Sequence, residues 1–192
     1  QDYKSIAYAM PSNFGAIKRI NIIQDPDSFK RNLNMYIISE DMNGNLTTAN
    51  SSIKNNLKNW INQSRMINDT VDILDAKIVN IGIDFIAKGE VETNRFLILD
   101  RATQALRDKF GTQKMDIGEP FYITEIYKTL QQVPGLVDVL SVKITQKTGS
   151  SYSDTYFDIE GETSADERYI NVPLNCVLEI KIPSQDIKGA IK

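Results

Sequence analysis

Acidic side chains are the residues of this 192-residue chain best suited to chemistry. The densest group is a run of six carboxylates: Asp154, Asp158, Glu160, Glu162, Asp166 and Glu167. Ca²⁺ binds several such oxygens when a sharply turning loop brings them together. The spacing does not match an EF-hand loop, because no glycine stands at the position where that loop turns. We therefore interpret the run as a solvated loop, and we expect no specific metal site and no cofactor.

Two other sets of carboxylates are candidates for acid–base chemistry. Asp25 and Asp27 flank Pro26, a pattern that predicts an exposed turn, whereas acid–base work would need a cleft that shifts one pKa. A hydrolase that uses carboxylates alone, as glycoside cleavage does, would need a glutamate in an apolar pocket facing a second carboxylate. Glu90, Glu92, Glu119 and Glu125 are the candidates, beside turns or at a helix start. A hydrolase domain is thus the alternative to a non-catalytic protein.

Nucleophilic catalysis finds little support in the composition. The chain has one cysteine, Cys176, and no histidine, so the commonest base for generating a thiolate is missing. Cys176 lies in an apolar stretch and is interpreted as a small buried hydrophobe. Glycine-rich phosphate loops are also absent from the sequence. We expect that the chain is not an enzyme.

Charge and hydropathy disfavour two classes of partner. The 22 basic and 25 acidic residues give a net charge of −3, with no basic stripe for neutralising phosphates, so we expect no nucleic-acid partner. No apolar run approaches the roughly 20 residues that span a bilayer, so we expect no membrane partner. The chain begins at Gln1 and is interpreted as a piece of a longer protein.

The hydrophobic periodicity predicts an α+β fold. Helices are predicted at 53–64, 93–110 and 122–133, after a mixed segment over 1–15 that ends in a loop at 11–15. Strands are predicted at 17–23, 34–39, 70–74, 77–87, 136–144, 156–159, 169–172 and 177–182. Their alternating polarity is atypical of buried parallel strands and favours small mixed sheets packed against two long helices and one shorter helix. We predict two subdomains, 1–75 (strand–strand–helix–strand) and 76–192, the second with an exposed connection at about 147–168.

Large apolar residues mark the predicted core and the candidate contacts. We expect the two long helices to bury five side chains: Trp60, Ile61, Phe96, Leu99 and Leu106. Tyr152, Tyr156 and Phe157 stand in the otherwise polar connection. Such aromatic residues either fasten the connection to the domain or contact a partner, and tyrosine is enriched at interfaces. They are the candidate partner contacts.

Three stretches, read in order, resemble the baseplate J-like family. The first is Phe14-Gly-Ala-Ile-Lys-Arg-Ile20, followed by Met35-Tyr-Ile-Ile38 and Asp41-Met-Asn-Gly44. The second runs from Ile53-Lys-Asn-Asn-Leu57 through Arg65-Met-Ile-Asn-Asp-Thr-Val-Asp-Ile73, with the order Arg-x-Ile-x-Asp-x-Val. The third comprises Ile117-Gly-Glu-Pro120, Ile123 to Ile126, and Val133-Pro-Gly-Leu-Val-Asp-Val139. Together they span about residues 14–145, while Leu136 replaces the family's usual valine and 148–168 resembles an insertion.

The resemblance implies a structural protein of the virion tail. Within the family, the chain is most similar to the C-terminal part of the ring-forming baseplate wedge subunit of T-even-type contractile-tail phages. Such a late protein would assemble in the host cytoplasm, pair with a second copy of itself as a homodimer and bind other baseplate wedge proteins. The wedges would then join into a closed ring, and no residue of the resembling stretches would be catalytic.

Overall fold

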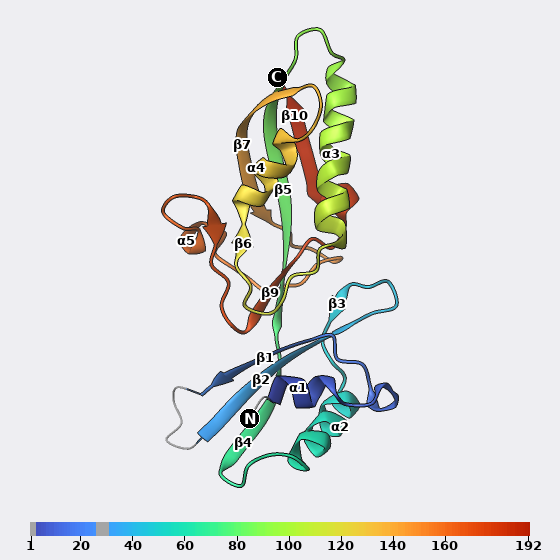
Figure 1. Cartoon of the computed structure of the whole chain (residues 1–192), viewed down its shortest axis with the longest axis vertical. Helices are drawn as coiled ribbons and strands as arrows, with labels where there is room; N and C mark the ends of the chain where they lie inside the picture. Colours follow the sequence, from blue (N-terminus) through green and yellow to red (C-terminus); the bar gives the residue numbers. More distant parts are fainter. Residues whose placement is uncertain (1–2, 26–30) are drawn as a thin grey trace. The chain divides into compact units, whose positions relative to one another are not determined.

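The computed structural model describes residues 3–25 and 31–192, which form two compact units (Figure 1). The first unit consists of Gln1–Ile78, Asp116–Gly118 and Pro173–Val177, and the second of the remaining residues. The predicted subdomain boundary at residue 75 is close to Ile78. However, the two short segments that complete the first unit belong to the predicted second subdomain.

The first unit is a sheet covered by two helices. Its elements are, in chain order, α1 (Tyr3–Tyr8), a 3-10 turn (Ser12–Phe14), β1 (Arg19–Gln24), β2 (Arg31–Glu40), β3 (Leu46–Thr47), α2 (Ser51–Asn62) and β4 (Asp69–Asp75). β2 is the central strand: β1 and β3 pair with it antiparallel, and β4 pairs with it parallel. A parallel pair requires a crossover connection, and α2 supplies it between β3 and β4.

Helix α2 shows why this unit folds as it does. The Asn50 side chain accepts a hydrogen bond from the Ile53 amide at 2.8 Å and so caps the helix. Leu57 and Ile61 then fall one turn apart and are buried in the core of the unit. Trp60 packs partly buried against that core and donates from its indole nitrogen to the Ile6 carbonyl at 2.8 Å. The predicted burial is thus correct for Ile61 and partial for Trp60.

Helix α1 lies in the mixed segment over residues 1–15, where no helix was predicted. Tyr3 and Ala7 are buried one turn apart in the core of the first unit. The Tyr3 hydroxyl donates to the Asp69 carboxylate at 2.6 Å. Helices this short are stabilised by tertiary packing rather than by their own propensity, so the local pattern of residues is a weak signal for them.

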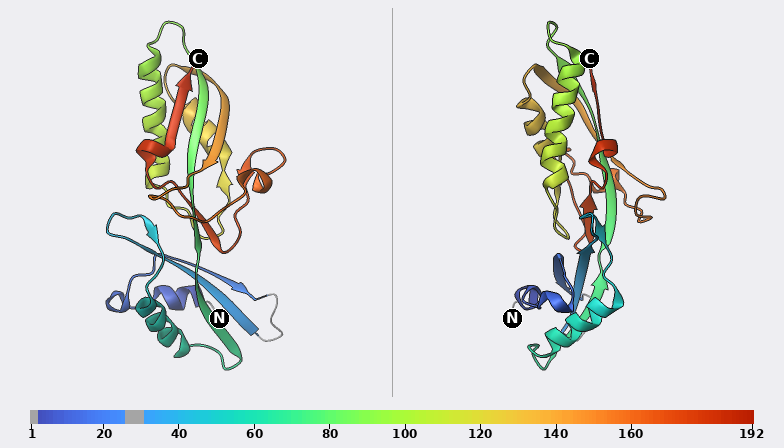
Figure 2. Two further views of the ribbon diagram at one scale, coloured as in Figure 1. Left: turned by 180° about the vertical axis from the view of Figure 1, so that it is seen from behind. Right: turned by 90° about the vertical axis from the view of Figure 1, so that its right-hand side faces the viewer.

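The second unit is a sheet with its two longest helices on one face (Figure 2). Its elements are β5 (Lys77–Gly89, which starts in the first unit), α3 (Arg95–Thr112), β6 (Phe121–Tyr122), α4 (Ile123–Gln131), β7 (Leu136–Gln146), α5 (Ile159–Glu162), β8 (Tyr169–Ile170), β9 (Cys176–Glu179), α6 (Pro183–Asp186) and β10 (Ile187–Ile191). The strand order is β10-β5-β7, with β10 parallel and β7 antiparallel to β5, and β9 also pairs with β5. β6 and β8 form a separate two-stranded sheet.

The mixed α+β class with several small sheets is confirmed. The longest described helices have 18 residues (α3), 12 residues (α2) and 9 residues (α4), so the prediction of two long helices is not confirmed. The strand predicted at 156–159 is wrong, because helix α5 begins at Ile159 instead. In the described part of the chain, no helix is both long enough and apolar enough to cross a membrane.

The buried face of α3 differs from the predicted one. Ile98, Ala102, Leu106 and Phe110 are buried, Leu99 is half-buried, and Phe96 is 83% exposed, so its predicted burial is wrong. Asn94 caps the helix by accepting from the Phe96 amide at 2.9 Å, which leaves Phe96 in the first turn. Ile98 and Leu99 both lie about one helical turn before Ala102, so the spacing alone does not show which of them is buried. Packing against the sheet buries Ile98.

Two glycines hold the positive φ that the turns need. Gly135, at φ 88°, ends the connection from α4 to β7, and a Cβ there would meet the Ile98 side chain at 3.3 Å. Gly118, at φ 77°, lies against Leu174 with only 3.0 Å from a Cβ to the Leu174 Cα. Residues other than glycine are therefore disfavoured at both positions.

Candidate functional site

None of the carboxylates proposed for hydrolysis is fully buried. Glu90, Glu92 and Glu119 are exposed, and Glu125 is half-buried. A hydrogen bond from Lys109 lowers the pKa of Glu125, whereas a general acid needs a raised pKa. Among the described residues, no three acidic or cysteine side chains are grouped so that they could hold a metal ion.

Cys176 and the Asp25–Asp27 turn complete the sequence candidates for chemistry. Cys176 is 5% exposed, which confirms its interpretation as a buried hydrophobe, and burial raises the pKa of its thiol. A raised pKa disfavours the nucleophilic thiolate. Asp25 donates its amide to the Asn32 carbonyl at 3.0 Å, whereas Asp27 lies outside the described residues.

The connection at 147–168 is fastened to the second unit by a buried carboxylate. Asp186, 1% exposed, accepts from the Tyr152 hydroxyl at 2.6 Å and from the Ile182 amide at 2.8 Å. The hydrogen bond to this carboxylate, together with burial, raises the pKa of Tyr152 to about 12. Tyr152 therefore ties the connection to helix α6.

A buried asparagine holds the same connection from strand β5. The Asn80 side chain, 1% exposed, accepts from the Ser153 amide at 2.7 Å and donates to Glu179 at 2.9 Å. Its main-chain carbonyl accepts from the Lys147 amide at 2.9 Å. Sequence reasoning missed Asn80 and Asp186, although an asparagine inside the apolar run Ile78–Phe85 was a usable signal, because a buried amide needs partners.

The three aromatic candidates have different environments. Tyr152 is half-buried and bonded to Asp186, and Phe157 is 8% exposed. Tyr156, between them, is 82% exposed. Tyr152 and Phe157 therefore fasten the connection to the second unit, while a partner contact at Tyr156 stays a prediction.

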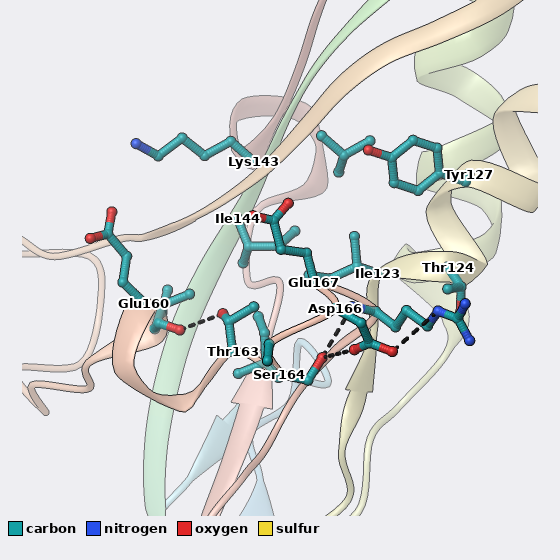
Figure 3. Close-up of a pocket in the computed structure, with 15 residues that line it drawn as sticks. Ile123, Thr124, Tyr127, Lys143, Ile144, Glu160, Thr163, Ser164, Asp166 and Glu167 are labelled. Carbon is teal, nitrogen blue, oxygen red and sulfur yellow. Dashed lines mark hydrogen bonds and ion pairs between the residues drawn. The ribbon is translucent and has the colours of Figure 1, made fainter.

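A groove of about 650 Å³ lies in the second unit beside strand β7 (Figure 3). One side is formed by α4, through Ile123 and Tyr127, and another by Val142, Lys143 and Ile144 of β7. The remaining lining comes from the segment Ile159–Ile170, which includes α5 and β8. The sequence predicted the strand at 136–144 but contained no signal that it would border a groove.

Hydrogen bonds fix the turn that forms the third side of this groove. The Ser164 hydroxyl accepts from the Arg168 amide at 3.1 Å and donates to Asp166 at 2.7 Å. The Glu167 amide donates to the Ser164 carbonyl at 2.8 Å, and Glu167 has a φ of 54°. This turn belongs to the acidic run and holds Glu167 in a set orientation.

Large apolar side chains are exposed elsewhere in the second unit. They are Val91 (97%), Phe96 (83%), Leu97 (44%), Val137 (60%) and Leu140 (49%). The two segments that carry them are joined by a hydrogen bond from the Glu90 amide to the Gly135 carbonyl at 2.9 Å. Exposed apolar residues in neighbouring segments are typical of a surface that another protein covers.

Comparison with known proteins shows a similarity of fold. No protein-family model matches the chain, and no curated protein matches it. In the cryo-EM structure of the anti-feeding prophage (AFP) baseplate, 6-fold symmetrised, one chain superposes on this one with a TM-score of 0.53. The match covers 94% of this chain and 37% of that chain, at 11% sequence identity. The chain thus shares its fold with a part, somewhat over a third, of a baseplate protein.

Proposed function

We propose that this chain is a structural component of a contractile-tail baseplate, and that it acts by self-association and by binding other baseplate proteins. One observation carries the proposal: 94% of the chain matches the fold of a protein of the AFP baseplate. The match extends through both units, so the similarity is not that of one common substructure. The stretches that resemble the baseplate J-like family support the same role from the sequence.

The wedge is the proposed place within the baseplate. The resemblance to the ring-forming wedge subunit of T-even-type phages suggests it, with the chain as the C-terminal part of a longer subunit. In that role the chain joins neighbouring wedges into a ring. The location of such a protein is the tail baseplate of the virion, after assembly in the host cytoplasm.

A non-catalytic role is part of the proposal. The exposed positions of Glu90, Glu92 and Glu119 and the lowered pKa of Glu125 give a carboxylate-based hydrolase no specific support. By contrast, the exposed apolar residues around Val91, Phe96 and Val137 suit a protein whose surfaces become covered on assembly.

Light scattering on the purified chain tests self-association. We expect a dimer, at twice the monomer mass of 21.7 kDa, with an interface above roughly 1,000 Å². Phe96→Asp should shift the particle toward the monomer, because it places a charge on an apolar contact. The matched control is Glu92→Gln, a change at a neighbouring exposed polar residue, which should leave the dimer intact.

A strict monomer at tens of micromolar would contradict self-association of this chain. A dimer that Phe96→Asp leaves unchanged would show that the surface around Phe96 is not the interface. Circular dichroism of both variants establishes that any loss of the dimer is not a loss of folding.

A further inference from the structure

The outer edge of β7 has no paired strand among the described residues. β7 pairs with β5 on one side, and no other strand in the described ranges pairs with it. Across these ranges, no loop or helix makes a backbone hydrogen bond to residues 137–145. An edge strand of this kind presents unpaired N–H and C=O groups that can hydrogen-bond an added chain.

The nearby connection is held away from this edge by a side chain. The Gln146 carboxamide donates to the Thr155 carbonyl and accepts from the Phe157 amide at 3.1 Å. Both bonds are made by the side chain of Gln146, the last residue of β7, and not by the main chain of the strand. The connection therefore runs past β7 without adding a strand to it.

The groove beside β7 has room for an extended segment. Its volume of about 650 Å³ is lined on the apolar side by Ile123, Tyr127, Ile144 and Ile170. Ile123, Ile144 and Ile170 are buried in the unit, so the lining is anchored in the core. An added strand would place alternate side chains on this apolar lining and the others toward the opposite rim.

That opposite rim carries negative charge. Glu160 and Glu167 line the groove, and within the part of the chain that the structure describes their carboxylates make no hydrogen bond or ion pair. Arg168 is instead paired with Asp166, at 3.2 Å. Figure 3 shows Glu160 and Glu167 among the side chains that line the groove. Lys143, the one cation of the lining without an ion pair in the described residues, is outnumbered by these two carboxylates, so the groove favours a basic side chain.

We propose that the groove binds an extended, basic segment of a partner protein, which adds to β7 as a further strand. Apolar side chains of the segment lie against Tyr127 and Ile144, and a lysine or arginine lies beside Glu167. The main chain of the segment hydrogen-bonds the open edge of β7, which gives affinity, while the groove selects the side chains. This inference rests on the proposed assembly role, because it names the kind of segment that a neighbouring subunit contributes.

Fluorescence anisotropy with the 192-residue chain and labelled peptides of about six residues tests the proposal. The probe alternates valine with lysine. One comparison peptide alternates valine with glutamate, and another is the valine–lysine peptide with alternate backbone amides N-methylated. We expect the valine–lysine peptide to bind at least about tenfold more tightly than either comparison peptide, because each of them lacks one part of the recognition.

Variants of the chain locate the binding site. Glu167→Lys should weaken the valine–lysine peptide by about fivefold or more, and Glu160→Lys provides a second rim variant should the first fail to fold. Glu92→Lys, an equal change of charge outside the groove, should leave the affinity unchanged. Equal binding of the N-methylated peptide, indifference to both rim variants, or no binding of the valine–lysine peptide would overturn the proposal. None of these outcomes bears on self-association or on presence in a baseplate, which are measured without the peptides.

Discussion

Leu106→Ala is expected to lower the free energy of unfolding by about 2–5 kcal/mol, out of a total of about 5–15 kcal/mol for a domain. Leu106 is fully buried on the face of α3 that packs against the sheet of the second unit. Truncation to alanine removes apolar contacts and leaves a cavity that rigid neighbours cannot fill. Urea denaturation followed by circular dichroism measures the loss.

Phe96→Ala is the matched control on the same helix. Phe96 is 83% exposed, so its truncation should change the free energy of unfolding by less than about 0.5 kcal/mol. The measurement is made at protein concentrations low enough to favour the monomer, because dissociation of a dimer would otherwise add to the apparent loss. A destabilisation by Phe96→Ala equal to that by Leu106→Ala would contradict the assignment of the buried face.

Tyr152→Phe is expected to destabilise the second unit by about 1.5–3 kcal/mol. The variant removes the hydroxyl that donates to Asp186 and leaves this buried carboxylate with the Ile182 amide as its remaining bonded partner in the described residues. Removing one of two hydrogen bonds from a buried carboxylate is costly, which is why the expected effect of this single bond is large. Tyr156→Phe is the control, since Tyr156 is 82% exposed and its hydroxyl should contribute little.

The effect of Tyr152→Phe should depend on pH in a defined direction. The Asp186 hydrogen bond raises the pKa of Tyr152 from 10.0 to about 12, so the folded state holds the phenolic proton more tightly than the unfolded state. The resulting stabilisation is complete below about pH 10 and is lost as the pH rises toward about 12. The difference in unfolding free energy between the wild type and Tyr152→Phe should therefore narrow between about pH 10 and about pH 12. A difference that stays constant over this range would show that the Tyr152–Asp186 hydrogen bond does not form in solution.

The sequence was sufficient to predict the elements whose hydrophobic periodicity alone indicates a helix or a strand. The helix at 53–64 and the strand at 77–87 correspond to α2 and β5, because regular apolar spacing and capping residues mark them. Helix α1 and strand β10 were not predicted. α1 depends on packing of Tyr3 and Ala7, and β10 depends on a parallel pairing with β5, more than 100 positions earlier in the chain. Local patterns carry little information about contacts of that range.

The candidate site was harder to predict from the sequence than the fold. Tyr152, Tyr156 and Phe157 were singled out as aromatic residues in a polar segment, but their different roles depend on Asp186 and Asn80, which lie in other elements. The acidic run was correctly located, yet only the structure shows that Glu160 and Glu167 border a groove beside β7. Whether a strand is central or at an edge is a property of the sheet, and alternation along the strand does not encode it.

Cryo-EM of intact tail particles tests the baseplate role most directly. The particles are purified from the organism that encodes this chain, and the baseplate is reconstructed at a resolution that shows side chains. The account predicts density for both units of this chain within the baseplate, in symmetry-related copies around the tail axis that contact one another and other baseplate proteins. A baseplate reconstructed completely from other proteins, with no density for this chain, would contradict it.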